Sequence, residues 1–179
     1  VDATPPDDMP SYSAIMFAEV AEHHDAYADR RDRYRTSIRE FVEVADGFRS
    51  AEAYIAAVRA REGSTAAWES WFAEHRVDVL LEPTCPSTAP ARGHGYDSGN
   101  LGGETDPLIM LTHTWNHVGF PAVALPAGMG ARTGLPVGVS LVAPRGREAP
   151  LLQIAIDLQE HALGTLPPEG GPSRPGPSG

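Results

Sequence analysis

The chain has 179 residues, 41% of them hydrophobic, which suffices for one compact domain or for part of a larger one. Its formal charge of -10 and pI near 5.0 argue against a nucleic-acid or anionic-membrane partner, because those surfaces repel an acidic protein without a basic face. The single cysteine, Cys85, excludes an internal disulfide, and no stretch approaches the roughly 18 apolar residues of a membrane span. We therefore expect a cytoplasmic protein.

Residues 11–76 read as helical, because Ala, Glu and Arg are abundant, Pro is absent and apolar residues recur every three or four positions. The pattern predicts several short helices, with stops at Gly47 and near Gly63. The residues expected to cap their starts are Ser11 or Ser13, Ser50, and Ser64 or Thr65. This half offers packing surface and no evident chemistry.

From Val77 the period changes, and a short apolar run that stops at Pro83 predicts a buried strand. Residues 83–107 are rich in Gly, Pro, Ser and Thr and predict a long loop, which in a compact protein is usually functional or disordered. The remaining expected elements are a helix at 108–118, strands at 122–125 and 137–142, and a helix at 148–163. This order indicates an α/β sheet, and the polar residues beyond Gly164 predict a disordered tail.

Three phrases in the second half follow one another in a recognisable order. They are DVLLEPTCPSTAP at 78–90, THTWNHVGFPAVALPAG at 112–128 and GLPVGVSLVAPRGRE at 134–148. Together they resemble the C-terminal part of the amidase signature family of amide hydrolases. The resemblance implies an α/β fold, in which the C-terminal part of an amidase-signature fold, a mixed sheet flanked by helices, follows a helical first half. The expected division is a helical segment at 1–76 packing on the core, an α/β part at 77–164 and a tail at 165–179.

The chain contains no lysine, and every one of its 14 basic residues is Arg. The amidase signature family uses a Ser, cis-Ser, Lys triad, in which Lys relays protons through a bridging Ser to the nucleophilic Ser. An Arg cannot replace that Lys, because its guanidinium stays protonated. The Gly/Ser-rich signature loop of the family is also unmatched, so the resemblance transfers no catalytic residue. A coding bias toward Arg would deplete Lys as well, but its chemical consequence is the same.

The resemblance does imply the wall of an acyl-binding pocket. The segments that border this pocket in relatives correspond to Thr84, Cys85 and Pro86 on one side, and to Asp106, Ile109, Thr112 and His113 on the other. Three further positions resemble a polar anchor, a tight turn and a chain redirection, and are expected to be structural: Asn116, Gly119 and Pro121.

His113 and His117 permit another interpretation, because a spacing of four on a helix places both rings on one face, as a metal site requires. A third donor would have to come from His94 or Glu104, and the bland alternative is a pair of pocket-lining or solvent-facing histidines. We therefore predict neither a metal nor another cofactor. Cys85 follows a strand, as a nucleophile can, but the sequence shows no activating base near it.

The sequence favours one function over two others. The favoured one is the small chain of a split or processed amidase that cleaves a small-molecule carboxamide, hydrolytically or with acyl transfer, while a second polypeptide carries the triad. The first alternative is a non-catalytic binding or regulatory protein that retains this fold. The second is an independent metal hydrolase that uses His113 and His117.

Overall fold

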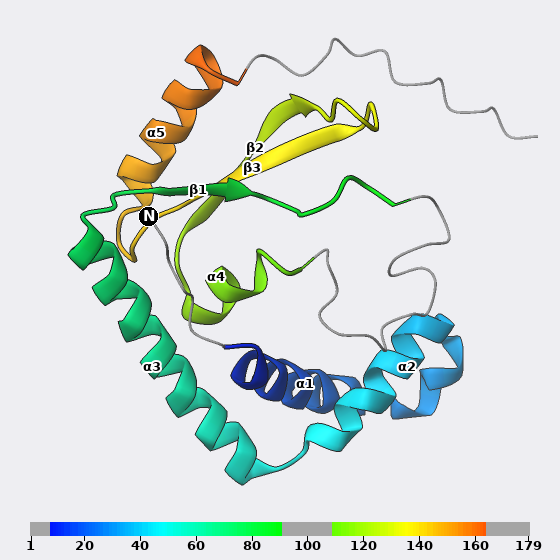
Figure 1. The fold of residues 1–179 in the computed structure, drawn as a ribbon. Helices are drawn as coiled ribbons and strands as arrows, with labels where there is room; N and C mark the ends of the chain where they lie inside the picture. The colour runs from blue at the N-terminus through cyan, green and yellow to red at the C-terminus, as the bar shows by residue number, and fades with distance from the viewer. Residues whose placement is uncertain (1–7, 91–108, 164–179) are drawn as a thin grey trace, which may run out of the picture.

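The computed structural model describes residues 8–90 and 109–163 (Figure 1). The first range contains α1 (Met9–Asp25), η1 (Ala28–Arg33), α2 (Thr36–Ala45), η2 (Asp46–Phe48), α3 (Ala51–His75) and β1 (Leu80–Pro83). The second contains α4 (His113–Val118), β2 (Ala122–Met129), β3 (Pro136–Val142) and α5 (Glu148–His161). The predicted tail and the larger part of the predicted loop lie outside the described residues. None of the helices in these two ranges is long and apolar enough to cross a membrane.

The helical first half is confirmed, but its longest helix is continuous where the sequence predicts a break. Helix α3 runs for 25 residues through Gly63, so the predicted stop there and the predicted new start at Ser64 or Thr65 are wrong. The hydroxyl of Thr65 donates to the Arg61 carbonyl at 2.9 Å, as a threonine inside a helix does, rather than capping a new one. The turns of α3 that follow Gly63 pack against the sheet. The stabilisation from this packing outweighs the small cost of one glycine inside a helix.

Of the predicted helix starts, one is confirmed and one is displaced. Ser50 caps α3, because its hydroxyl accepts a hydrogen bond from the Ala53 N–H at 3.2 Å. Helix α1 already begins at Met9, so Ser11 lies inside its first turn. Its hydroxyl donates to the Asp8 carbonyl at 2.9 Å instead of capping the helix.

The three strands form a small antiparallel sheet in the order β1-β3-β2. Leu80 and Ala122 both pair with Val142, which places β3 between the other two strands. Within residues 8–90 and 109–163 every strand pair is antiparallel, so any parallel pairing of the expected mixed sheet is not among them. Three boundaries in the second half of the chain differ from the predictions by three residues or more. The first strand begins at Leu80, and α4 begins only at His113, after turns at 109–112. Strand β2 continues to Met129 instead of ending at 125.

Helices cover both faces of this sheet (Figure 1). Successive residues of β3 point to opposite faces. Val142 joins an aromatic cluster whose other buried members are Trp68, Phe72, Trp115, Val118 and Phe120. Leu141, on the other face, packs in an aliphatic cluster with Leu151 and Ala155 of α5. The sheet therefore fixes α3 and α4 on one side and α5 on the other.

Gly63 and Gly119 form a matched pair for testing the backbone. Gly63→Ala is expected to raise the free energy of unfolding by about 0.5–1 kcal/mol, because Ala is the better helix former. An added Cβ there meets no atom within 4 Å. Gly119→Ala is expected to lower the free energy of unfolding by about 1–2 kcal/mol, because Gly119 has a left-handed backbone conformation with a φ of 72°. Urea denaturation measures both, and destabilisation by Gly63→Ala would contradict the continuous helix.

Candidate functional site

The segment that follows β1 lines a cavity of about 930 Å³. Its walls are residues 84–89 on one side and residues 124–126, 130–133 and 136–138 of the β2–β3 hairpin on the other. The structure thus brings Thr84, Cys85 and Pro86 together in one hollow, as the resemblance implies for one side of a pocket. The lining mixes apolar side chains with hydroxyl groups, which is the composition of small-molecule sites.

Thr84 is held in place by two bonds to β3. Its N–H donates to the Gly138 carbonyl at 3.1 Å, and its Oγ1 lies 2.8 Å from Oγ of the buried Ser140. A Cβ at Gly138 would lie 3.3 Å from both the Leu125 carbonyl oxygen and Thr84 Oγ1, so only glycine fits there without displacement. Strand β2 and the residue after β1 therefore approach the backbone of Gly138 closely at this part of the cavity wall.

A carboxyl group on β1 faces the aromatic cluster. The Trp115 Nε1–H donates to Glu82 Oε1 at 2.5 Å. Burial raises the pKa of Glu82 although this hydrogen bond acts in the opposite direction. The bond ties α4 to the strand that leads into the cavity. Sequence reasoning missed Glu82, although a Glu inside an otherwise apolar strand was a visible signal.

The residues expected on the opposite wall are not among those lining this cavity. Asp106 lies outside the described residues. Ile109 and Thr112 belong to the turns before α4, where the Thr112 N–H and the His113 N–H both donate to the Ile109 carbonyl at 3.0 Å. His113 is buried and its Nε2 lies 3.2 Å from Asp8 Oδ1. In Figure 1 the segments after β1 and before α4 run toward the same side of the molecule.

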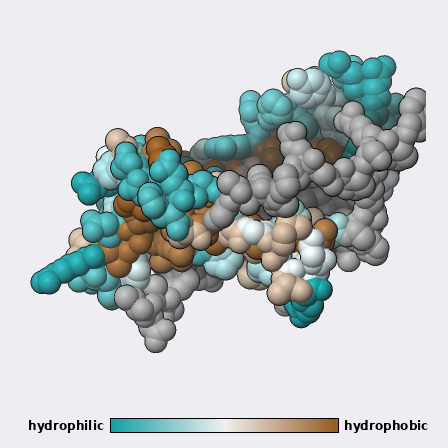
Figure 2. Space-filling view, turned by 90° about the horizontal axis from the view of Figure 1, so that it is seen from above, coloured by the Kyte–Doolittle hydropathy of each residue, from teal (hydrophilic) through white to brown (hydrophobic). Residues whose placement is uncertain are grey.

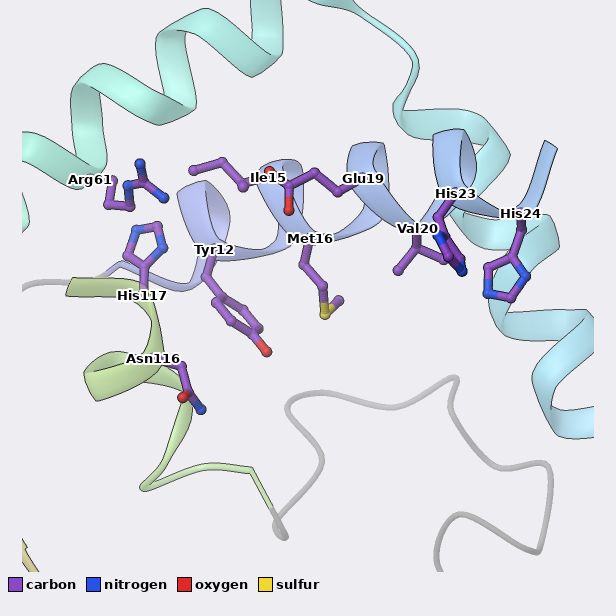
Figure 3. Close-up of a pocket in the computed structure, with 10 residues that line it drawn as sticks. All are labelled: Tyr12, Ile15, Met16, Glu19, Val20, His23, His24, Arg61, Asn116 and His117. Atoms are coloured by element: carbon purple, nitrogen blue, oxygen red, sulfur yellow. The ribbon is translucent and has the colours of Figure 1, made fainter. Parts of the chain in front are cut away.

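A second cavity of about 420 Å³ lies between α1, α3 and α4. Figure 3 shows Arg61 of α3 next to His117 of α4, with Tyr12 of α1 near His117 and Met16 further along α1. Arg61 has no carboxylate within ion-pair distance in the part of the chain that the structure describes. A half-buried guanidinium without a paired anion can bind an acidic or carbonyl group of a ligand. The sequence held no signal for Arg61, because helical arginines are usually surface residues.

The three positions expected to be structural lie around α4. The Asn116 side-chain amide donates to the Thr112 carbonyl at 3.0 Å. Gly119 ends α4 in a left-handed conformation, with its N–H donating to the Trp115 carbonyl at 2.9 Å. The Pro121 carbonyl accepts from the Ala143 N–H at 3.1 Å just before β2. Their structural role stays a prediction, which these bonds suit.

The two histidines of α4 bind different partners on α1 rather than sharing one ligand. His117 Nε2 lies 2.8 Å from Ser11 Oγ, whereas His113 faces Asp8. Among the described residues no group of three His, Cys, Asp or Glu side chains could hold a metal ion. The third donors considered from the sequence, His94 and Glu104, lie outside those residues.

Comparison with known proteins gives the class of the molecule. The family model for Amidase matches residues 8–152. A mitochondrial glutamyl-tRNA(Gln) amidotransferase subunit of Mycosarcoma maydis is 31% identical over 149 residues, which cover 83% of this chain and 25% of that protein. Mandelamide hydrolase of Pseudomonas putida is 32% identical over 121 residues, covering 65% of this chain and 22% of that enzyme.

The solved structures agree. A 6-aminohexanoate cyclic dimer hydrolase superimposes with a TM-score of 0.73 and 28% identity, covering 92% of this chain and 38% of its own. The fold is therefore that of the amidase-signature enzymes, and the chain belongs to the amidase family. It spans 25% and 22% of the lengths of the two curated relatives. The resemblance seen in its three sequence phrases is confirmed.

Proposed function

We propose that this chain is the small chain of a split or processed amidase-signature hydrolase. It supplies part of the pocket wall, while a partner polypeptide carries the Ser, cis-Ser, Lys triad and the oxyanion-binding loop. Together the two chains cleave the C–N bond of a small carboxamide and transfer its acyl group to water or to another acceptor. No nucleic acid or membrane takes part, and the location is cytoplasmic.

One observation carries this proposal: the chain matches the amidase family over residues 8–152 and yet contains no lysine. A triad that relays protons through an amine cannot be assembled from these residues. The cavity after β1 and the guanidinium of Arg61 nevertheless offer surfaces for binding a small polar molecule. A chain that binds but lacks the triad needs that triad from elsewhere.

The exposed apolar side chains support a partner that covers one side of the sheet. Strand β1 is bonded to β3 on one edge, and its Leu81 is 56% exposed. On α5, Leu152 and Ile156 are 54% and 51% exposed. In Figure 2, which views the molecule from above Figure 1, apolar surface lies open between hydrophilic side chains. An open strand edge suits pairing with another strand, and exposed apolar side chains suit a protein interface.

Intact-mass analysis of the native complex purified through this chain tests the proposal. We expect a second polypeptide that contains Lys and a Gly/Ser-rich loop. The purified pair should release acid from a panel of small carboxamides, and the chain alone should release none. A folded, monomeric chain without a companion would contradict the proposal and favour a non-catalytic binding protein. A single longer polypeptide containing both parts would retain the amidase and contradict the split.

A further inference from the structure

His113 is buried at the start of α4, and both of its ring nitrogens face oxygen atoms. Nδ1 lies 3.2 Å from the Ile109 carbonyl, which can only accept a hydrogen bond and also accepts from the N–H groups of Thr112 and His113. Nε2 lies 3.2 Å from Asp8 Oδ1. A neutral imidazole carries one N–H and can satisfy one of these acceptors. The imidazolium donates to both.

Asp8 supplies the charge that such an imidazolium needs. Its side chain is only 3% exposed, and its Oδ1 also accepts from the Thr114 hydroxyl at 3.5 Å. Its Oδ2 has no hydrogen-bond partner in the part of the chain that the structure describes. Within those residues His113 is the basic side chain that lies within ion-pair distance of this carboxylate, at 3.2 Å. A neutral His113 would leave a buried Asp8 carboxylate without a paired positive charge, which is costly.

His117, one turn further along α4, behaves in the opposite way. The single hydroxyl proton of Ser11 points to the Asp8 carbonyl, so Ser11 Oγ accepts from His117 Nε2–H. The other ring nitrogen, Nδ1, then carries no proton in the neutral ring. Burial lowers the pKa of His117. The charge of Asp8 opposes this change, and the charges of Arg61 and His113 act in the same direction as burial.

The titratable groups packed around His113 come from two helices. The start of α1 contributes Asp8 and Tyr12, whose ring centroid lies 5.5 Å from that of His113. Helix α4 itself contributes His117, while Arg61 of α3 acts on His117. The hydrogen bond to Asp8 raises the pKa of His113, against the opposing effect of burial. The geometry and the direction of this change agree.

We propose that His113 is a positioning residue, which as an imidazolium fastens the turn at Ile109 to Asp8 at the start of α1. This turn carries Ile109 and Thr112, the residues expected on the second wall of the amide pocket. The part concerning the pocket rests on the proposed function. The charge state of His113 and its bridging role do not.

The pH dependence follows from the direction of the change. The folded protein holds the His113 proton more tightly than the unfolded chain, whose histidines have a pKa of about 6.5. Stabilisation by the bridge is fully present below about pH 6.5 and is lost as the pH rises through the higher pKa of the folded state. Above that pH the neutral ring of His113 can donate to Asp8 or to the Ile109 carbonyl but not to both, so the bridge through the ring is lost.

NMR titration of the full chain, or of its native complex, tests the bridge directly. The chain has seven histidines, and the ring signal that is missing from the spectrum of His113→Gln is assigned to His113. We expect His113 to titrate above about pH 6.5 and His117 below it. Asp8→Asn, which keeps the shape of the side chain, should lower the His113 midpoint by about one pH unit or more. A midpoint at or below about 6.5, or one unchanged in Asp8→Asn, would overturn the proposal.

Kinetics of the native complex test the connection to the pocket. KM for the amide should rise roughly tenfold as the pH passes the His113 midpoint, with kcat less affected, because a pocket contact is weakened. His113→Gln should show the raised KM at every pH. His161→Gln is the matched control, because His161 is exposed at the end of α5, and this variant should behave as wild type. A pH-independent KM ratio between wild type and His113→Gln would overturn the positioning role.

The two failures are distinguishable. A complex without amidase activity would contradict the proposed function. The midpoint of His113 in the NMR titration would still decide whether this residue is the charged bridge. An active complex in which His113 titrates with a midpoint below about pH 6.5 would contradict the charged bridge and would still agree with the proposed function.

Discussion

Trp115→Ala is expected to lower the free energy of unfolding by about 3–5 kcal/mol, the usual cost of removing a buried aromatic side chain. Trp115 is 6% exposed, and its ring centroid lies 4.8 Å from that of Trp68 and 6.1 Å from that of Phe120. The substitution also leaves Glu82 without its indole donor. Loss of packing and loss of a hydrogen bond to a half-buried carboxyl act in the same direction.

Two variants separate these contributions in urea denaturation. Trp115→Phe keeps a ring in the cluster and removes the N–H, so a loss of about 1–2 kcal/mol is expected. Leu152→Ala is the control, because its side chain is 54% exposed and should change stability by less than about 0.5 kcal/mol. Equal effects of Trp115→Ala and Leu152→Ala would show that the aromatic cluster does not stabilise the fold.

Leu81→Arg is expected to weaken assembly with the triad-bearing chain by roughly a hundredfold, because a charge would enter an apolar interface. Amidase activity at low protein concentration should fall in parallel. The side chain is 56% exposed in this chain, so its own unfolding free energy should change by less than about 0.5 kcal/mol. Titration of one chain with the other, followed by activity, measures the dissociation constant.

Ile38→Arg provides the matched control for this surface. Ile38 is 44% exposed on α2, which lies away from β1 and α5 in Figure 1. We expect this variant to assemble with wild-type affinity. If Leu81→Arg also assembles normally, the partner does not cover the β1 edge, and the proposed interface must lie elsewhere.

Local patterns predicted the elements whose formation depends on neighbours in sequence. The stop of β1 at Pro83, the capping of α3 by Ser50 and the end of α4 before Gly119 are all visible in short windows. Gly63 shows the limit of such reasoning. Its intrinsic preference against helix is small, and burial of Trp68 and Phe72 further along α3 outweighs it.

The candidate site likewise contains contacts between sequence neighbours, which the sequence indicated, and contacts between distant residues, which it did not. Adjacent residues such as Thr84, Cys85 and Pro86 share a cavity because they are neighbours on one strand end. The bond between Trp115 and Glu82 joins residues 33 apart, and spacing alone did not suggest it. The resemblance predicts that His113 lines the pocket, and this assignment stays a prediction. The contact of His113 with Asp8 is seen only in the structure.

By itself the sequence determined that this chain has the motifs of the amidase family and no lysine with which to complete the triad, because residue identity decides which proton transfers are possible. Only the tertiary structure decided that two histidines of α4 have different partners and different charge preferences. His113 and Asp8 are 105 residues apart, so their meeting depends on how α1 packs against α4. The hydrogen bond to Asp8 raises the pKa of His113 against the effect of burial, whereas burial lowers the pKa of His117, and no local pattern indicates this difference.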